Sequence, residues 1–273
     1  MSAETSSQQK NLIRDRFTKT AEVFSSFAVP DRVNSAESLA EMVAASKTDR
    51  AVDLACGPGT LALRFARHAR WVCGLDLTPA MLARARQTAE VEGLTNLSLA
   101  IGDAQSLPFS DGSLDIAVTS YSLHHMSDPA RVVAEMARVV RKGGRVGVLD
   151  IRAPEDPRVD DLNHRIEFSR DPSHTRSLTP ARLHEIIQRA GLRILATRTE
   201  EHPRSFDHWL HVAGWRRGDQ VYEDTRRLME SSIPGDASGF HPRYSEIPKD
   251  AADARQDILM INTAQLVAAE KIG

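Results

Sequence analysis

Short, mostly apolar runs recur along the first half of the chain, and each is followed by apolar residues at helical spacing. Runs of this kind are typical of buried parallel strands, and their alternation with helices is typical of an α/β fold. The pattern predicts a mostly parallel sheet of seven strands with helices on both faces. The predicted strands are residues 51–55, 71–75, 96–101, 113–120, 145–151, 192–199 and 258–268.

The residues before the first strand predict two helices, 10–28 and 31–46. The first of these places Ile13 and Phe17 on an apolar face, with charged residues mostly opposite. The polar residues 1–9 are expected to be disordered. Phe17 either closes over a bound cofactor or simply packs its ring on the domain, and the pattern leaves both interpretations open.

A glycine turn follows the first strand. Gly57 and Gly59 flank Pro58, and this triplet neither continues a strand nor fits inside a helix. The second strand ends at Asp76, which lies 19 residues after Gly57. A strand, a glycine turn, a helix and a second strand that ends in an acid form a Rossmann-like βαβ unit. Such units bind nucleosides.

Two kinds of nucleoside cofactor fit this unit. Residues 57–62 satisfy the dinucleotide pattern G-x-G-x-x-A, which is weak evidence by itself. Pro58 removes one of the backbone N–H groups that hold a pyrophosphate, and the Asp53 carboxylate would repel phosphate. The same carboxylate would attract the ammonium and sulfonium groups of S-adenosylmethionine (SAM), and Asp76 would bind its ribose hydroxyls. The alternative for Asp53 is a solvated carboxylate at the end of a strand.

Further polar residues follow the third and fourth strands. Asp103 comes after the third, and Tyr121 through His125 come after the fourth. Ligands of such sheets bind at the carboxyl ends of the strands, where Asp53 and Asp76 also lie. Asp103 by itself fits a turn aspartate equally well. The coincidence of four such features at one edge is what predicts a binding site.

The regular alternation lapses after the fifth strand. Residues 152–178 and 201–257 are charged, proline-containing or irregular, and Trp209 looks exposed within the second range. Insertions at these points lie over the carboxyl end of the sheet, so we expect a helical cap around an acceptor pocket. The predicted organisation is a pair of N-terminal helices in residues 1–47 that flank the cofactor site, and a SAM-binding domain in residues 48–273 that contains both insertions.

Composition narrows the choice of protein class. The chain has 273 residues and a formal net charge of -2, which fits one capped α/β domain without a global attraction to nucleic acid or anionic membrane. No apolar run of about 18 residues occurs, so no stable membrane insertion and a cytoplasmic location are expected. Cys56 and Cys73 fit buried apolar roles in a reducing compartment better than a disulfide or a metal site. A homodimer is left open.

The chain resembles the class I SAM-dependent methyltransferases, and it is most similar to the branch of ubiquinone and menaquinone biosynthesis C-methyltransferases, labelled methyltransferase type 11. The resemblance covers residues 48–151, in the segments VDLACGPGT, GLDLTPAML, GDAQSLPFSDGSLDIAVTSYSLHHMSDP and EMARVVRKGGRVGVLD. It implies a SAM cofactor and S-adenosylhomocysteine as a product. The chain departs from the family at Ala55, where the acid-x-G-x-G-x-G turn usually has its first glycine. The backbone carbonyl of Ala55 can still face the methionine amino group.

The resemblance also implies a role for each matched position. The implied cofactor contacts are Asp53 and the backbone of Ala55, Gly57 and Gly59 on the methionine part, Asp76 on the ribose, Leu77, Met81, Asp103 and Ala104 on the adenine, and Ser120 and Tyr121 near the sulfonium.

Candidates for catalysis and acceptor binding lie nearby. A hydroxyl, a phenol or an acidic carbon needs a base, and His124 and His125 are the nearest imidazoles, although one of the pair could be structural. Arg152 and His174 are candidates for binding the acceptor, and Arg152 favours an anionic group. Both also fit surface positions on an irregular cap.

The sequence therefore predicts a SAM-dependent methyltransferase for a small-molecule acceptor that is quinone- or phenol-like, with transfer to oxygen, carbon or nitrogen. A nicotinamide-dependent oxidoreductase is disfavoured by Pro58 and Asp53, and a non-catalytic SAM-binding regulator stays an alternative. The segment TSYSLHHM replaces the Asn/Asp-Pro-Pro-Tyr/Phe motif of nucleic-acid methyltransferases, and no basic cluster is present, so no nucleic-acid partner is expected.

Overall fold

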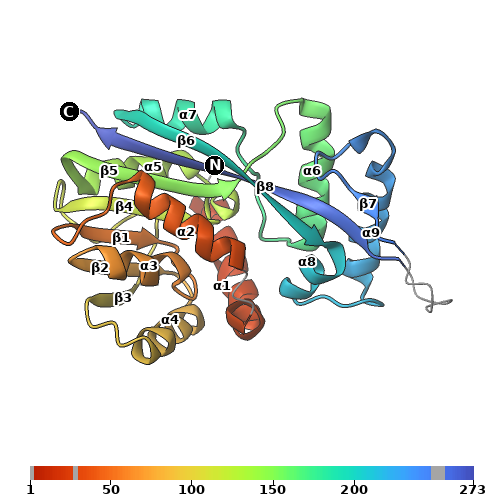
Figure 1. Ribbon diagram of the computed structural model, residues 1–273, viewed down its shortest axis with the longest axis horizontal. Helices are drawn as coiled ribbons and strands as arrows, with labels where there is room; N and C mark the ends of the chain where they lie inside the picture. Colours follow the sequence, from red (N-terminus) through yellow and green to blue (C-terminus); the bar gives the residue numbers. More distant parts are fainter. Residues whose placement is uncertain (1–2, 27–29, 247–255) are drawn as a thin grey trace.

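The computed structural model describes residues 3–26, 30–246 and 256–273. In these residues one sheet runs through the molecule in the strand order β3-β2-β1-β4-β5-β8-β6, and a short β7 pairs with β8 (Figure 1). The strands are β1 (Arg50–Leu54), β2 (Trp71–Asp76), β3 (Leu97–Ile101), β4 (Leu114–Ser120), β5 (Val140–Ile151), β6 (Leu192–Ser205), β7 (Arg243–Tyr244) and β8 (Ile258–Lys271).

The first five strands pair in parallel, and β8 lies antiparallel between β5 and β6. This topology confirms the predicted α/β fold with its mostly parallel sheet. Each of the seven predicted strands is present, and the structure adds the two-residue β7. Strand order reverses at β1 and β4, which is the point where open α/β sheets bind their ligands.

Nine α-helices form in the described residues. They are α1 (Ala3–Ser26), α2 (Pro30–Met42), α3 (Thr60–His68), α4 (Pro79–Val91), α5 (Pro129–Val139), α6 (Pro157–Arg170), α7 (Pro180–Arg189), α8 (Phe206–Val212) and α9 (Gln220–Ser232). Three of them begin with the same local chemistry: Asp128, Asp156 and Thr179 each cap the helix start with a side-chain oxygen, and a proline occupies the first turn.

Helices cover both faces of the sheet because the strand residues are apolar on both sides. Val52 and Leu54 of β1 pack in one buried cluster, which includes residues of α5 and α7. Ala51 of the same strand packs in a second cluster, with residues of α2 and α3. Adjacent residues of a strand point to opposite faces, so one short run supplies both clusters.

Beyond the core sheet, β6 and β8 continue into a second group of elements made of α6, α8, α9 and β7 (Figure 1). A third apolar cluster holds this group together, with Phe206, Trp209 and Tyr222 in it. Trp209 is therefore buried, and its predicted exposure was wrong. The ring packs against Phe206 of the same helix and against Phe240, which is distant in the chain, and the local pattern does not reveal that second contact. Part of the predicted second insertion, residues 247–255, lies outside the described residues.

Helix α1 begins earlier than the sequence predicts. Residues 3–9 are helical, so their predicted disorder was wrong; residues 1–2 and 27–28 lie outside the described residues. The Gln9 side chain donates hydrogen bonds to the carbonyls of His125 and Ser173, and these tertiary contacts hold a polar segment that cannot form a core of its own. None of the described helices is both long and apolar enough to span a membrane. The division of the chain near residue 48 stays a prediction.

Candidate functional site

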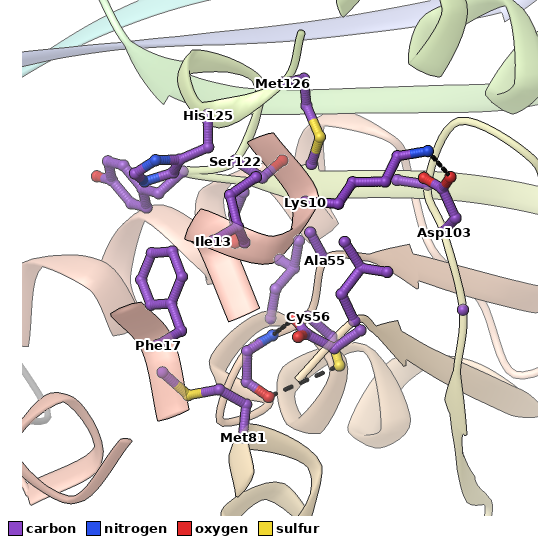
Figure 2. Close-up of a pocket in the computed structure, with 18 of the residues that line it drawn as sticks. Lys10, Ile13, Phe17, Ala55, Cys56, Met81, Asp103, Ser122, His125 and Met126 are labelled. Carbon is purple, nitrogen blue, oxygen red and sulfur yellow. Dashed lines mark hydrogen bonds and ion pairs between the residues drawn. The ribbon is translucent and has the colours of Figure 1, made fainter. Parts of the chain in front are cut away.

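A pocket of about 1030 Å³, which includes space open to solvent, lies at the carboxyl ends of β1 to β4. Its walls come from the turn after β1, the ends of β2 and β4, the loop after β3, and helix α1 (Figure 2). Most of the predicted cofactor residues meet here. The predicted residues that line it are Phe17, Ala55, Gly57, Asp76, Leu77, Met81, Asp103, Ala104, Ser120, Tyr121 and His125.

The turn after β1 has left-handed backbone at three positions. Gly57 and Gly59 have φ of 53° and 87°, and Ala55 has φ of 51°. A Cβ on Gly59 would come within 2.9 Å of the Ala85 Cβ, so Gly59 allows α3 to pack closely on α4 behind the pocket. At Gly57 an added Cβ would meet no atom within 4 Å, because that position faces open space. Ala55 adopts the backbone conformation for which the family uses glycine.

Asp76 fixes this turn while it lines the pocket. One carboxylate oxygen accepts from the Gly57 N–H and the other from the Thr78 N–H, both at 2.8 Å. Burial raises the pKa of Asp76, and these backbone donors lower it in part. Each carboxylate oxygen can accept a second hydrogen bond, so the group retains capacity for a ligand hydroxyl.

Asp53 lies behind the turn, fully buried on β1 rather than on the pocket surface. Burial raises the pKa of its carboxyl well above the usual range, although the nearby Ala62 N–H opposes this rise. Neither oxygen has a hydrogen-bond partner of good geometry among the described residues. A buried carboxyl without a partner is costly, and a cationic ligand in the adjacent turn offsets such a cost better than a phosphate does. The buried Asp53 carboxyl thus fits SAM, which is cationic, better than it fits a cofactor that carries phosphate.

Helix α1, which carries the predicted Phe17, supplies a wall of the pocket, and sequence reasoning missed the part that Lys10 has in it. Lys10 Nζ lies 2.6 Å from a carboxylate oxygen of Asp103, the acid predicted to contact the adenine (Figure 2). Ile13 and Phe17 follow at one and two turns along the same helix face. That spacing is readable in the sequence, but Lys10 carries no motif that marks it as part of a site.

A second pocket of about 790 Å³, again counted with open space, adjoins the first. Phe17, Tyr121 and His125 line both pockets. The remaining walls are supplied by β6, β8, α8 and the end of α6, so this pocket lies between the core sheet and the second group of elements. Tyr121 has φ of 48°, an uncommon conformation for a bulky residue that is often found at functional sites.

His124 lines the second pocket and is held by Asp150, near the end of β5. Its Nδ1 lies 2.5 Å from Asp150 Oδ1, and its backbone N–H donates to Asp150 Oδ2 at 3.1 Å. Burial lowers the pKa of His124, but Asp150 and the further carboxylates of Glu167 and Asp171 outweigh it, and the net pKa is above the ordinary value. Sequence reasoning missed Asp150, although it follows the strand-end rule that identified the other acids.

His125 and His174 have pKa values below the ordinary value, unlike His124. Burial and the neighbouring His124 lower the pKa of His125 to about 4, so His125 is neutral at physiological pH. Its ring packs edge-on against Phe17, with 5.1 Å between centroids. Burial also takes the pKa of His174 well below its ordinary value, and its ring lies 5.3 Å from that of His124.

Besides His124, four of the predicted site residues do not line the first pocket. Asp53 and Gly59 are behind it, as described above, and neither Arg152 nor His174 lines either of the two pockets. Arg152 follows β5, where its N–H donates to the Thr263 carbonyl. His174 packs behind His124 in a ring stack. Their predicted contact with an acceptor stays a prediction.

Known proteins share this arrangement. A family model described as a methyltransferase domain matches residues 52–148. An uncharacterized methyltransferase, YcgJ, of Bacillus subtilis is 33% identical over 165 residues, which are 60% of this chain and 65% of that protein. Its crystal structure has a TM-score of 0.78 and 26% identity, and covers 88% of this chain and 99% of the other.

Two further relatives extend the comparison. An uncharacterized protein of Escherichia coli, YafE, is 32% identical over 167 residues, which are 61% of this chain and 80% of YafE. A ubiquinone/menaquinone biosynthesis C-methyltransferase of Dinoroseobacter shibae, UbiE, is 36% identical over 124 residues, 44% of this chain and 50% of UbiE. The chain thus spans half to four fifths of the curated relatives named here. On the sheet order, the glycine turn and these matches, the chain belongs to the class I methyltransferase family with a type 11 methyltransferase domain.

Proposed function

We propose that this protein binds SAM in the first pocket and transfers its methyl group to a small molecule held in the second. The observation that carries the proposal is the wall of Phe17, Tyr121 and His125, which belongs to both pockets. A methyl donor and an acceptor on the two sides of this wall would be neighbours. Alignment of two reactants can lower an activation barrier by up to about 7–11 kcal/mol.

The residues that would hold the cofactor follow from the pocket. The buried Asp53 carboxyl and the turn of Ala55 and Gly57 would hold the cationic methionine part. Asp76 would accept from the ribose hydroxyls, and Leu77 and Met81 supply apolar surface for the adenine. When bound, SAM supplies a methyl group on a cationic sulfur, which departs as a neutral thioether.

The acceptor needs a base if it loses a proton, and we assign that role to His124. A carboxylate accepts hydrogen bonds and does not donate them, so Asp150 keeps the proton of the neutral ring on Nδ1. Nε2 is then left without a proton and can accept one, and His124 lines the second pocket. His125 has a pKa of about 4 and would be a much weaker base. The role we assign to His125 is therefore positional, as part of the shared wall.

The acceptor class that suits this base is a phenol or a similar acidic hydroxyl. The proton moves from the hydroxyl to His124, and the phenolate then attacks the methyl group through oxygen or through an activated ring carbon. The curated relative from Dinoroseobacter is named a C-methyltransferase of quinone biosynthesis, which is compatible with such an acceptor. A cytoplasmic location stays a prediction from the sequence, and a homodimer stays open.

The test of cofactor binding is calorimetric titration of the protein with S-adenosylhomocysteine and, separately, with NADH. We expect micromolar binding of S-adenosylhomocysteine, at least about tenfold weaker in Asp76→Asn, because the variant loses a charged acceptor. Asp111→Asn is the matched control, since Asp111 is on the surface with 80% of its side chain exposed. Binding of NADH without S-adenosylhomocysteine would contradict the proposal and support an oxidoreductase.

Methyl transfer itself is tested by screening phenolic acceptors with methyl-labelled SAM. We expect His124→Gln to bind S-adenosylhomocysteine as tightly as the wild type and to lose transfer by about 10²-fold or more. Cofactor binding without transfer to any small molecule, together with a response of a partner protein to the cofactor, would favour a SAM-binding regulator.

A further inference from the structure

Asn262 is a buried polar side chain in the wall of the second pocket. It lies on β8 with 8% of its surface exposed. Its Oδ1 has no hydrogen-bond partner in the part of the chain that the structure describes. Met260 and Ala264, two residues away on either side and so on the same face of the strand, are buried and apolar. Because a buried polar atom without a partner costs free energy, an amide at this position indicates a ligand that donates a hydrogen bond to it.

The neighbouring strand does not supply the missing hydrogen bond. His202 of β6 pairs directly with Asn262 of β8 and also lines the pocket. Its Nε2 lies 3.5 Å from the Ser35 hydroxyl of α2 and 3.8 Å from a carboxylate oxygen of Glu200. The polar neighbour nearest in the sheet is thus engaged with α2 and with its own strand, and Asn262 is left for a ligand.

Charged side chains of the same pocket are compensated within the protein. Nη1 of Arg170 forms an ion pair with Glu167. The Asp171 carboxylate accepts from the backbone N–H of Ser173 at 2.9 Å and from its hydroxyl at 2.7 Å, and Arg16 of α1 lies 3.5 Å from the same oxygen. An acceptor therefore needs no charge of its own to satisfy Arg170 or Asp171.

The chemistry of a carboxamide limits what the ligand can present to Asn262. Oδ1 accepts a hydrogen bond and Nδ2 donates, and a hydroxyl matches either atom because it can both donate and accept. Phe17 and Tyr121 of the shared wall supply ring surfaces that suit an aromatic ligand. One hydroxyl of such a ligand reacts at His124, so a hydrogen bond to Asn262 requires a second one.

We propose that Asn262 selects a neutral phenol that carries a second hydroxyl, which donates a hydrogen bond to Oδ1 while the first hydroxyl reacts near His124. The inference rests on the proposed methyl transfer, and it adds a specificity-determining residue to the acceptor site. Asn262 lies well outside residues 52–148, which match the methyltransferase domain. The selection thus resides in the part of the chain beyond that match. The second hydroxyl keeps its proton, because a carboxamide accepts a hydrogen bond without acting as a base.

The test compares two such phenols with isosteres in which a methyl group replaces the second hydroxyl. The probes are 1,3-dihydroxybenzene with 3-methylphenol, and 4-(hydroxymethyl)phenol with 4-ethylphenol. Each is titrated calorimetrically into the protein with and without saturating S-adenosylhomocysteine. A pocket without a polar partner favours the apolar isostere, which costs less to remove from water. We expect the opposite for at least one pair, by about tenfold or more, because the isostere leaves Oδ1 unpaired.

Variants assign this preference to Asn262. Asn262→Leu and Asn262→Ala both remove the carboxamide, and the preference for the second hydroxyl should disappear in each. Gln265→Met is the matched control. Gln265 is on the same strand, is buried and also has a side-chain oxygen without a partner among the described residues, but it lines neither of the two pockets. The preference should therefore be unchanged in Gln265→Met.

Equal or reversed affinities within both pairs of probes would overturn the proposal, as would no phenol binding at millimolar concentration. A preference that survives in both Asn262 variants would overturn it as well. If the second hydroxyl is preferred but S-adenosylhomocysteine does not bind, the methyl-transfer proposal fails and the Asn262 subsite stands. If S-adenosylhomocysteine binds and neither pair shows a preference, the subsite fails alone. Circular dichroism confirms that each variant is folded, and the comparison within the wild type is decisive even if a variant does not fold.

Discussion

The Asp150 carboxylate accepts two hydrogen bonds from His124, one from the ring Nδ1 at 2.5 Å and one from the backbone N–H at 3.1 Å. One side chain therefore sets both the tautomer of the ring and the position of the loop that carries it. Both residues are buried, so solvent does not compete for these contacts.

Replacing Asp150 with asparagine tests this pairing. The amide can donate to Nδ1 and shift the ring proton to Nε2, where it blocks proton acceptance, so we expect methyl transfer to fall about 10²- to 10⁴-fold. Binding of S-adenosylhomocysteine should not change, because Asp150 does not line the first pocket. Single-turnover rates with labelled SAM check the first expectation and titration checks the second. A variant with full activity would show that the tautomer does not matter.

The dependence of the rate on pH follows from the raised pKa of His124. The base must be neutral, so kcat should increase with pH through that pKa, which lies above the ordinary 6.5, and then level off. In Asp150→Asn the raising charge is gone, and the residual activity should reach its plateau at a lower pH. Rates measured between about pH 6 and 9 cover both the rise of kcat and its plateau. Identical midpoints in the two proteins would contradict the assignment of His124.

Asp171 is expected to contribute stability that depends on pH. Burial raises its pKa, but His125, Arg16 and the Ser173 hydroxyl lower it further, to about 2 from an unfolded value near 3.8. A lowered native pKa stabilises the fold above the unfolded pKa, and this stability disappears as the pH falls through 3.8 to about 2. We expect Asp171→Asn to cost up to about 2 kcal/mol of unfolding free energy at pH 7, where Arg16 and the Ser173 hydroxyl still act on the carboxylate but His125 is neutral.

The measurement for Asp171 is urea unfolding of wild type and Asp171→Asn at pH 7 and again near pH 2.5. The difference in unfolding free energy should shrink at the lower pH, because the carboxyl of the unfolded chain is protonated there and that of the native protein has begun to be. Asp111→Asn, at an exposed position, should change the stability little at either pH. A cost that is the same at both pH values would point to lost packing instead of charge.

Much of the first pocket could be predicted from the sequence because it obeys local rules. A glycine turn after a buried strand forces the chain to turn at Gly57 and Gly59, and parallel strands bring their carboxyl ends together. Asp76 and Asp103 therefore meet at one edge without any knowledge of distant contacts. Asp150 follows the same rule, and the strand that carries it was predicted, so that residue was within reach.

The second pocket could not be predicted in the same way. Arg170, Arg204 and Trp209 come from three elements that meet only because β6 and β8 extend beyond the core sheet. The length of that extension depends on the pairing of two strands over 50 residues apart in the chain, and no local pattern encodes it. The role of Lys10 could not be predicted for the same reason, since the docking of α1 brings it near its partner Asp103.

Ala55 stores strain that can be removed. Its φ of 51° is left-handed, which costs a residue with a Cβ about 1–2 kcal/mol relative to its preferred backbone. Ala55→Gly should raise the unfolding free energy by up to about 1 kcal/mol, after the greater chain entropy of glycine is subtracted. Ala44, at φ 47° after α2, is the matched control, and Ala44→Gly should stabilise the protein by a similar amount. If Ala44→Gly stabilises and Ala55→Gly does not, the strain at Ala55 is offset by contacts of its methyl group.

An alanine at position 59 would meet both backbone strain and a close contact, and comparison with an alanine at Gly93 separates the two costs. Both have positive φ, 87° and 67°, so an alanine at either position costs about 1–2 kcal/mol. An added Cβ at Gly59 would also lie 2.9 Å from the Ala85 Cβ, whereas at Gly93 it would meet nothing within 4 Å. Overpacking of this kind costs about 1–3 kcal/mol more.

We therefore expect Gly59→Ala to lower the unfolding free energy by about 2–5 kcal/mol, and Gly93→Ala by about 1–2 kcal/mol. Urea unfolding measures both, with equal slopes required for the comparison. The double variant Gly59→Ala with Ala85→Gly removes the colliding methyl group, so it should recover most of the excess cost, less about 1 kcal/mol for a glycine inside α4. Equal costs for the two single variants would show that α3 can move away from α4, and that the glycine is needed for its backbone conformation alone.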